Sequence, residues 1–339
     1  MKIWFPVIRG GSGTDVFTRR LADALQRRGI ATEITWFSTH YQFAPFLLRS
    51  VPPPDGTNII HTNSWNGFAF KRPGIPLVVT EHHCVLDPTY RPYKNLAQHI
   101  FHATAVRRFE MASFRAASAI TAVSRFTASS LANTLGIHSS RVIYNWIDTK
   151  AFAPPNQNLS SVRRPFRLLF VGNLSRRKGA DFLAPIMRKL GPEFELRFTS
   201  GLRALKTRGL TQNMLPLGRL TEDSELIRAY HQCDVLLFPS RFEGFGYVAL
   251  EAMACGKPVI AANNSALPEV VKNGETGILC PTDDIHAFVS ATRKLAADRE
   301  ILLAYGQAAR RRTENFFSEY LIIPQYISLY EELVDGRER

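Results

Sequence analysis

Short apolar runs alternate with helix-patterned segments along the whole chain. The first half contains runs of strand length at Ile3–Ile8, Glu33–Phe37, Asn58–His61, Leu77–Thr80, Ala119–Val123 and Val142–Tyr144. The second half contains further runs at Phe166–Val171, Glu195–Phe198, Val235–Phe238, Val259–Ala261 and Gly277–Leu279. This alternation is typical of a mostly parallel α/β sheet, because parallel strands are joined by crossover helices.

A polar stretch separates the two series of strands. The sequence from Ala153 to Pro165 is poor in apolar residues and rich in Pro, Asn and Ser, and we predict a linker at 156–165. Two Rossmann-like, doubly wound domains are therefore expected at 1–155 and 166–318, facing one another across an interdomain cleft. Ligands of such folds bind at the carboxyl ends of the strands.

Residues 319–339 are predicted to form a C-terminal helix. The aromatic and leucine-rich segment from Phe316 to Val334 contains Pro324, which is expected to interrupt the helix once. The helix packs either on the second domain or back on the first, and the pattern leaves both arrangements open.

Length and composition describe a globular protein. The chain has 339 residues, 45% hydrophobic and 21% charged, which suits two domains of ordinary size. It contains no run of the roughly 18 to 20 apolar residues that cross a bilayer, and its first residues read as a strand entering a turn instead of a signal peptide. A cytoplasmic protein is expected. Its four cysteines are widely spaced, which argues against a zinc site or a disulfide framework and predicts buried thiols.

The net charge of +13 is concentrated in the first half. Residues 1–157 hold 17 Lys and Arg against 8 Asp and Glu, whereas residues 158–339 hold 25 against 21. A basic surface attracts nucleic acid, anionic lipid or an acidic substrate, and it can equally be ordinary solubility charge.

The most informative segment runs from Val235 to Glu269. An apolar strand leads through the turn Glu243-Gly244-Phe245-Gly246 into a helix that carries Glu251. Such a turn presents unpaired backbone N–H groups and the positive end of a helix dipole, which suit phosphate oxygens, while the two glutamates suit hydroxyl groups. A nucleotide sugar has both features. The alternative is a plain strand–turn–helix whose glutamates are a solvated pair.

Two more turns follow predicted strands. Arg9–Asp15 is glycine-rich but lacks the third glycine of a dinucleotide fingerprint, so simple strand-to-helix geometry also explains it. The second turn, Gly172–Gly179, places Arg176, Arg177 and Lys178 just before a helix. Cations there oppose the helix dipole and lower stability unless an anion binds, which favours a functional interpretation.

The sequence lacks the motifs that several other kinds of chemistry require. Neither a P-loop nor an Asp-x-Asp pair for a divalent cation is found, and nothing suits hydride transfer. If a diphosphate binds, Arg177, Lys178 and backbone amides must neutralise it, so no metal or cofactor is expected.

The histidines divide into two groups. His82 follows the strand Leu77–Thr80 at a carboxyl edge where a substrate would lie, although a lone histidine is more often structural. His99 and His102 are three apart on a predicted helix beside several arginines, which favours a basic amphipathic face over a ligand pair.

With these residues assembled, the chain resembles a family 4 glycosyltransferase of the GT-B fold, a retaining, metal-independent group. The resemblance covers essentially the whole chain and is most specific at 243–261 (EGFGYVALEAMACGKPVIA) and at 268–279 (PEVVKNGETGIL). Asn145-Trp146-Ile147-Asp148 also meets the family pattern Asn-x-x-Asp.

The resemblance implies roles for individual residues. Glu243 would contact hydroxyls of the transferred sugar, Glu251 would hold the nucleotide ribose, and the Phe245 and Gly246 amides would meet the sugar and diphosphate. Arg177 and Lys178 would bind phosphate. The complete set of site residues is catalytic His82, Arg177, Lys178 and Glu243, with Gly13, Leu220, Gly244, Phe245, Gly246 and Glu251 binding the nucleotide sugar.

The sequence departs from the family pattern at two places. Many relatives begin the phosphate loop with Gly-Arg, where this chain has Gly172-Asn173, and many have two glycines before the Pro-Glu, where this chain has Ser265-Ala266-Leu267. The first departure removes one possible cation, so Arg177 is expected to carry more of the phosphate binding.

The implied reaction transfers a hexose from a UDP- or GDP-sugar, with retention, to a hydroxyl of a glycan or lipid-linked acceptor in lipopolysaccharide or surface-polysaccharide synthesis. The basic first domain, its run Tyr93–Arg115 and its apolar patch Phe43–Leu48 indicate an anionic acceptor and peripheral contact with an anionic membrane, on the cytoplasmic face of the inner membrane. The alternatives are an epimerase or phosphorylase of the same fold, a non-catalytic scaffold and a basic nucleic-acid-binding protein. The motifs favour the transferase, with no nucleic-acid partner.

Overall fold

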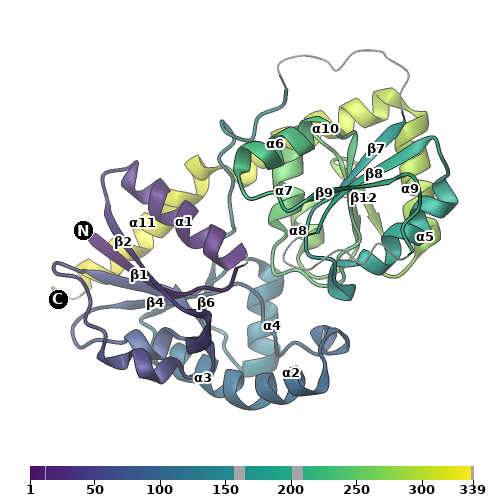
Figure 1. Cartoon of the computed structure of the whole chain (residues 1–339). Coiled ribbons are helices and arrows are strands. Elements are labelled where there is room, and N and C mark those ends of the chain that lie inside the picture. The colour runs from purple at the N-terminus through teal and green to yellow at the C-terminus, as the bar shows by residue number, and fades with distance from the viewer. Residues whose placement is uncertain (12, 156–164, 201–208, 337–339) are drawn as a thin grey trace. The chain divides into compact units, whose positions relative to one another are not determined.

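The structure is a computed structural model that describes residues 1–11, 13–155, 165–200 and 209–336 (Figure 1). The chain forms two compact units. The first unit is Met1–Asn145 together with Glu319–Arg339, and the second is Trp146–Ser318.

The first unit contains a parallel sheet whose strand order is β2-β1-β3-β4-β5-β6. Its strands are β1 (Lys2–Ile8), β2 (Ala31–Phe37), β3 (Ile59–Asn63), β4 (Leu77–Glu81), β5 (Ala119–Ala122) and β6 (Ser140–Val142). Its longer helices are α1 (Gly13–Gln26), α2 (Leu96–Phe101), α3 (Arg107–Ala116), α4 (Arg125–Leu135) and α11 (Glu319–Asp335). Short helical turns lie at η1 (Thr39–Gln42), η2 (Pro45–Ser50), η3 (Gly67–Phe70), η4 (Pro88–Tyr93) and the π-helical η5 (His102–Val106).

The second unit contains another parallel sheet, in the order β12-β11-β10-β7-β8-β9. Its strands are β7 (Phe166–Phe170), β8 (Phe194–Thr199), β9 (Met214–Gly218), β10 (Val235–Phe238), β11 (Val259–Ala262) and β12 (Gly277–Cys280). Its helices are η6 (Arg176–Lys178), α5 (Ala180–Leu190), α6 (Asp223–His231), α7 (Tyr247–Ala254), α8 (Leu267–Val270), α9 (Ile285–Ala297) and α10 (Arg299–Phe316).

Both sheets are doubly wound, so the expected fold class is confirmed. In the second unit the strand order reverses between β7 and β10, which pair through Val235–Leu168 and Leu236–Leu169. In the first unit the reversal falls between β1 and β3. In sheets of this kind, a ligand site is expected beyond the carboxyl ends of the two strands at the reversal.

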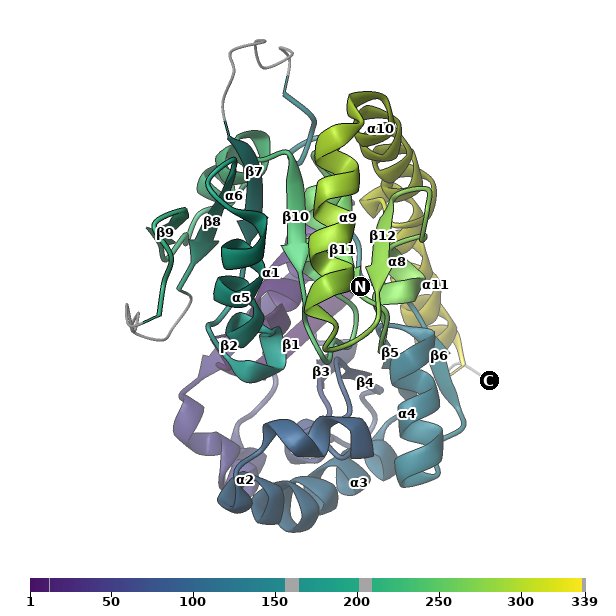
Figure 2. The same ribbon diagram turned by 90° about the vertical axis from the view of Figure 1, so that its right-hand side faces the viewer.

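The core of each unit lies between its sheet and the covering helices. In the second unit α5 and α9 lie side by side on one face of the sheet (Figure 2). Leu183, Ile186 and Met187 of α5 are buried against strand residues such as Leu168 and Leu196. Central strands such as β4, β10 and β11 are buried along their whole length, which explains why they read as continuous apolar runs.

One strand was not predicted. β9 (Met214–Gly218) lies at the edge of the second sheet, where most of its residues are exposed or half-buried. It contains Pro216, and proline is tolerated in an edge strand because its missing N–H need not pair with a neighbour. Met214, Leu215 and Leu217 are apolar, but the proline among them argues against a buried strand, so the hydrophobic pattern did not indicate this one.

The predicted interruption at Pro324 is wrong. α11 is continuous from Glu319 to Asp335 with Pro324 inside it, and the chain instead breaks between α10 and α11 at Phe317 and Ser318. Pro324 lies in the second turn of α11, where packing against the first unit outweighs one lost backbone hydrogen bond.

α11 packs on the first unit, beside α1 (Figure 1). The Tyr330 hydroxyl lies 2.6 Å from His61 Nδ1, and the other ring nitrogen of His61 lies 2.6 Å from the Thr80 hydroxyl. At the start of the helix, Glu319 accepts hydrogen bonds from Arg27 and Arg28. These contacts tie the tail to β3, β4 and α1.

Residues 146–155 group with the second unit, although the sequence placed the domain boundary at 155. Arg310 of α10 donates hydrogen bonds to the carbonyl oxygens of Thr149 and Phe152, at 2.8 and 2.7 Å. Nearly all of the predicted linker, 156–164, lies outside the described residues.

All four cysteines are free and buried, as expected. Among the described residues, none of the helices has the length and apolar character that crossing a membrane requires.

Candidate functional site

Two loops meet at the strand reversal of the second unit. One follows β7 and contains Arg177 and Lys178, and the other follows β10 and contains Glu243. Because β7 and β10 are paired neighbours, their carboxyl ends bring together residues 65 positions apart in the chain.

Gly179 allows these loops to approach closely. It has a left-handed backbone (φ +73°), and a Cβ at this position would lie 2.2 Å from the carbonyl oxygen of Pro239. Only glycine fits such a site without moving the backbone. The loops are further joined by the Arg241 N–H, which donates to the Arg177 carbonyl at 2.8 Å, and by Arg177 Nη1, which donates to the Phe242 carbonyl at 2.9 Å.

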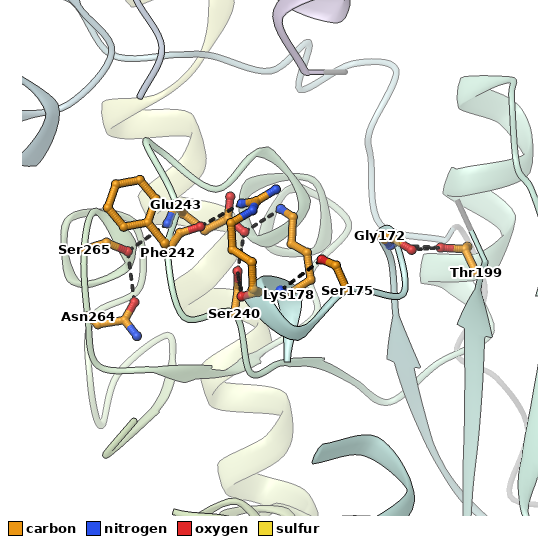
Figure 3. A network of polar contacts seen from close by, with 10 residues as sticks. Gly172, Ser175, Lys178, Thr199, Ser240, Phe242, Glu243, Asn264 and Ser265 are labelled. Carbon is orange, nitrogen blue, oxygen red and sulfur yellow. Dashed lines mark hydrogen bonds and ion pairs between the residues drawn. The ribbon is translucent and has the colours of Figure 1, made fainter. Parts of the chain in front are cut away.

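Lys178 and Glu243 form an ion pair at the centre of this arrangement (Figure 3). Lys178 Nζ lies 2.5 Å from Glu243 Oε1, and their side chains are only 16% and 10% exposed. The Ser240 hydroxyl donates to the same carboxylate oxygen at 2.5 Å. A cation and a carboxylate are thereby held together next to the chain's glycine-rich turn.

Burial and charge act against one another in this pair. Burial raises the pKa of Glu243, but Lys178 and Arg177 outweigh it, so the pKa lies below its usual value. Burial lowers the pKa of Lys178, and Glu243 partly opposes this change. The carboxyl group is therefore ionised at neutral pH and remains a hydrogen-bond acceptor.

The loop after β11 holds Glu243 from a third side. The Glu243 N–H donates to the Ser265 hydroxyl at 3.0 Å, and that hydroxyl donates to Asn264 Oδ1 at 2.9 Å (Figure 3). Ser265 has φ +47°, a conformation that favours glycine. This backbone explains why the family pattern has glycine in this stretch, and Ser265 supplies a hydroxyl in return.

Arg241 also holds these loops in place. Its guanidinium binds both carboxylate oxygens of Asp181 at 2.6 and 2.9 Å, and Asp283 at 2.5 Å. Burial disfavours its charge, but these two carboxylates outweigh burial and raise its pKa. Arg241 is thus neutralised within the protein.

The glycine turn leads into α7. Gly244, Phe245 and Gly246 are buried, and Gly246 caps the helix with φ +106°. A Cβ there would lie 3.0 Å from a methyl group of Leu267, so the turn also requires glycine. The first turn of α7 adds the positive end of its dipole to this loop.

Glu251 lies in α7 and is 5% exposed. Its Oε2 accepts a hydrogen bond of 3.0 Å from the hydroxyl of Tyr230 on α6. Burial and then Glu251 raise the pKa of Tyr230 well above its usual value, so the phenol stays a donor at neutral pH. The structure therefore holds this carboxylate in one orientation.

The remaining residue predicted in this unit, Leu220, is half-buried and lies between β9 and α6. At the end of β7, the N–H of Gly172 donates to the hydroxyl of Thr199, at 2.9 Å (Figure 3).

Gly13 and His82 belong to the first unit. Gly13 begins α1, and the carboxylate of Asp15 accepts the N–H groups of Gly10 and Gly11 at 3.1 and 2.8 Å. Asp15 thus binds two amides of this glycine turn, a contact that the sequence pattern did not reveal.

His82 directly follows β4 and is half-buried. Its ring packs edge-to-face on Phe17 of α1, with centroids 4.7 Å apart, and its Nε2 lies 3.1 Å from Asn63 Oδ1. Burial, and then His83 and His61, lower its pKa to about 3, so the imidazole is neutral at physiological pH. His82 and the start of α1 therefore lie together within the first unit.

His99 and His102 lie in different helical segments. The described part of the chain brings no three His, Cys, Asp or Glu side chains together as ligands. The helix predicted around them is divided: α2 ends at Phe101, and a π-helical turn begins at His102.

Two glycosyltransferase families match the chain. Residues 165–298 match the family described as Glycosyl transferases group 1, and residues 44–151 match Glycosyltransferase Family 4. The chain belongs to glycosyltransferase family 4. The signature around Glu243 and Glu251 lies inside the first of these matches.

Curated relatives act on different substrates, as their names state. An N-acetyl-alpha-D-glucosaminyl L-malate synthase of Bacillus anthracis is 25% identical over 57% of this chain and 54% of its own length. An alpha-maltose-1-phosphate synthase of Mycolicibacterium smegmatis is 28% identical over 84% of this chain and 82% of its own. The lipopolysaccharide core mannosyltransferase LpsB of Rhizobium meliloti is 32% identical over 57% of this chain and 61% of its own. The chain thus spans little more than half of the first and third relatives.

Solved structures of the same fold align over nearly the whole chain. A sucrose-phosphate synthase from Thermosynechococcus elongatus has a TM-score of 0.83 at 22% identity, covering 98% of this chain and 99% of that one. Anabaena HepE in complex with UDP-glucose has a TM-score of 0.78 at 21% identity, covering 98% and 100%. At these identities the likeness establishes the GT-B fold.

The sequence did not indicate Ser240, Ser265 or Asn264, which surround Glu243. Serine and asparagine are common in loops, so their presence carries little information. The left-handed backbone of Ser265 became visible only in the structure.

Proposed function

We propose that this family 4 member transfers a hexose, with retention and without a metal, from a UDP- or GDP-sugar to a hydroxyl of a glycan or lipid-linked acceptor. The observation that carries the proposal is the contact between Lys178 and Glu243, with Arg177 beside it, at the strand reversal of the second unit. One small region thereby offers cations for a diphosphate and a carboxylate for sugar hydroxyls.

The phosphate end of the sugar donor is assigned to the β7 loop. Arg177 and Lys178 would neutralise the diphosphate, with help from the amides of Phe245 and Gly246 and from the dipole of α7. Cations fixed in a buried loop stabilise charge on a leaving group without reorganising. This arrangement takes the place of a divalent metal.

The sugar and nucleoside ends are assigned to carboxylates. Glu243 would accept hydrogen bonds from hydroxyls of the transferred sugar, and Glu251 would accept them from the ribose. The Tyr230 hydroxyl orients Glu251 for this role. Leu220 is assigned to the base, where recognition would use backbone groups.

His82 and Gly13 are assigned to the sugar and the diphosphate from the first unit. The neutral imidazole of His82 can donate or accept a hydrogen bond but adds no charge. The Asp15 carboxylate already binds the amides of Gly10 and Gly11, so these amides do not bind phosphate. The role of Gly13 would be to let the diphosphate come close to the backbone, because glycine has no side chain.

In the proposed step, the acceptor hydroxyl oxygen bonds to the anomeric carbon on the face from which the diphosphate leaves. The anomeric carbon–oxygen bond to the diphosphate breaks, and the hydroxyl proton passes to the departing phosphate oxygen. Arg177 and Lys178 stabilise the negative charge that develops there. The product keeps the donor's anomeric configuration.

Comparison with relatives supports the substrate class. HepE was crystallised with UDP-glucose, and LpsB is named a lipopolysaccharide core mannosyltransferase. By analogy we propose a role in lipopolysaccharide or surface-polysaccharide synthesis on the cytoplasmic face of the inner membrane.

Exposed apolar side chains of the first unit support peripheral membrane contact. Phe43, Leu47, Leu96 and Ile100 are 60%, 59%, 75% and 53% exposed. Phe43 also packs on Phe101 of α2, with centroids 5.3 Å apart. Replacing Leu96 and Ile100 by serine should reduce co-sedimentation with anionic vesicles, whereas the half-exposed Leu303 of the second unit offers a matched control. Equal binding by all variants would contradict membrane contact.

The experiment that tests the activity is a thermal-shift panel of UDP-, GDP- and ADP-sugars. A ligand at a hundredfold excess over its dissociation constant should add about 2.7 kcal/mol to stability. The stabilising sugar is then incubated with glycan acceptors in a chelator, and NMR of the product reads its anomeric configuration. If none of these nucleotide sugars stabilised the protein, the proposal would be contradicted. A product with the inverted anomeric configuration would exclude a retaining mechanism.

A further inference from the structure

The first unit contains a cavity that none of the residues assigned to the sugar donor lines. Its volume is about 250 Å³, and it lies among the segment after β4, the α2–α3 region and the end of α4. The lining residues are Leu86, Asp87, Pro88, Arg91, Lys94, His99, Ala103, Arg107 and Thr134.

The charged residues in this lining are strongly unbalanced. Arg91, Lys94 and Arg107 are cations, and Asp87 is the one acid. Both carboxylate oxygens of Asp87 are already bound. Oδ1 accepts the N–H and the hydroxyl of Thr89 at 2.8 and 2.5 Å, and Oδ2 accepts the hydroxyl of Ser130 at 2.5 Å. Asp87 therefore holds the loop together, and its single charge balances only part of the three cations.

Lys94 is anchored at the cavity by its surroundings. Its ammonium group donates to the carbonyl of Val85 and lies 5.2 Å from the centre of the Tyr90 ring. Partial burial lowers its pKa. An ammonium group has three donors, so the bond to Val85 leaves capacity for a ligand.

The two arginines form no ion pair with any described residue. Arg91 lies in η4 and Arg107 begins α3, so separate elements bring them to the cavity. Glu110, a buried carboxyl group on the same helix as Arg107, balances these cations only in part. Burial, and then Glu81, raise its pKa well above the usual value, and Lys94 and Arg107 oppose this change.

Two further observations indicate a built site. Nδ1 of His99 is buried without a hydrogen-bond partner among the described residues. Ala103 belongs to a π-helical turn, which separates the adjoining helices and is often found at functional sites. The same lining therefore contains a buried nitrogen atom without a hydrogen-bond partner, a π-helical turn and three cations.

From this lining we propose that the cavity binds a phosphate group. Two guanidinium groups and an ammonium group offer many donors to a small tetrahedral anion, and guanidinium groups bind phosphate in a bidentate manner. The volume leaves room for part of the molecule that carries the phosphate. The site is separate from the sugar-donor residues, and its ligand is either a soluble phosphorylated compound or the phosphate of a lipid headgroup.

The test is calorimetric titration with inorganic phosphate at neutral pH and low salt. The double variant Arg91→Ala/Arg107→Ala removes two exposed cations, and Arg108→Ala removes a neighbouring exposed arginine of α3 that does not line the cavity. The double variant should bind phosphate at least about tenfold more weakly than the unaltered chain, because each charge-assisted contact contributes roughly a factor of ten. Arg108→Ala should bind like the unaltered chain.

Circular dichroism establishes that the variants fold, and Arg91→Lys/Arg107→Lys should recover part of the affinity. Glycerol 3-phosphate and phosphatidylcholine vesicles containing phosphatidic acid then distinguish a soluble ligand from a headgroup, and a variant-dependent difference with either probe supports the site. Equal phosphate affinity in the double variant and the unaltered chain would overturn the proposal. An equal loss in Arg108→Ala would overturn it too, since only general surface charge would then be involved. UDP binding by the same variants tests the sugar-donor site independently.

Discussion

Lys178 and Glu243, 65 positions apart in the chain, form a 2.5 Å ion pair that joins the loops after β7 and β10. Each group partly compensates the burial of the other. The pair explains why this helix start tolerates consecutive cations, since an internal carboxylate supplies the anion that the sequence pattern required. A bound diphosphate would share Lys178 with Glu243.

Breaking this pair should impair both transfer and stability. Lys178→Met should reduce turnover at saturating sugar donor by about two to three orders of magnitude, the usual loss for one contact that stabilises a developing charge. It should also lower stability by roughly 3 kcal/mol, because Glu243 stays buried but loses the ammonium group in contact with it.

Two further variants test whether these losses come from the pair between Lys178 and Glu243. Lys178→Met/Glu243→Gln should regain part of the stability but none of the activity. Lys272→Met breaks the exposed pair with Glu275, whose side chains are 59% and 50% exposed, and should change stability by less than about 1 kcal/mol. Full turnover in Lys178→Met would exclude its catalytic role.

Replacing Glu251 should weaken nucleotide binding more than it slows transfer. Glu251→Gln removes the charge that would receive the ribose hydroxyls, and we expect UDP or GDP affinity to fall at least about tenfold. Tyr230→Phe removes only the orienting hydrogen bond and should have a smaller effect. Calorimetry that finds the nucleotide affinity of Glu251→Gln unaltered would remove this residue from the site.

Gly179 and Gly136 each adjoin a helix and form a matched pair. Both have left-handed backbones, with φ +73° and ψ +22° at Gly179 and φ +69° and ψ +22° at Gly136, but a Cβ at Gly179 would meet the Pro239 carbonyl, whereas a Cβ at Gly136 would meet nothing within 4 Å. Gly136→Ala should cost about 1 kcal/mol from backbone strain alone. Gly179→Ala should cost at least about 2 kcal/mol more and disturb the Lys178 loop. Urea denaturation measures both, and equal losses would show that the loops can separate freely.

Acid should destabilise the first unit through His61. Burial lowers its pKa to about 3 from an ordinary value of 6.5, so the unfolded chain takes up a proton below pH 6.5 while the folded chain does not. The stability of the neutral, buried ring is fully present above pH 6.5 and declines as the pH falls toward 3. Between about pH 7 and about pH 5, the free energy of unfolding should therefore fall by about 2 kcal/mol less in His61→Gln than in the unaltered chain.

Tyr330→Phe is the control for this experiment, because it removes the hydroxyl next to His61 Nδ1 but keeps the ring buried. Its pH dependence should resemble that of the unaltered chain. Parallel stability curves for His61→Gln and the unaltered chain would mean that His61 is not the titrating group.

The hydrophobic pattern predicts most of the fold. Buried parallel strands such as Val235–Phe238 are apolar on both faces and stand out in the sequence. β9 does not, because Pro216 interrupts its apolar residues and argues against a buried strand. Pro324 predicted a break in the C-terminal helix that does not occur, since tertiary packing keeps α11 continuous.

The candidate site is predictable only in part. Spacing and glycine content indicate which loops face a ligand, but they do not reveal that Lys178 reaches Glu243, which depends on the pairing of β7 with β10. The contact of Asp15 with two glycine amides has no pattern of its own. Likewise, the cations around the phosphate cavity come from separate elements that only the tertiary fold brings together.

The central claim is that the loop after β7 binds the diphosphate of a nucleotide sugar, and calorimetric titration of UDP and GDP tests it most directly. Arg177 is half-buried beside Glu243, whereas the adjacent Arg176 is exposed, so their alanine variants differ in position but not in charge. We predict that the unaltered chain and Arg176→Ala bind one of these nucleotides with similar affinity and that Arg177→Ala binds it at least about tenfold more weakly. Failure of the unaltered chain to bind either nucleotide, or equal affinity in both variants, would contradict the account.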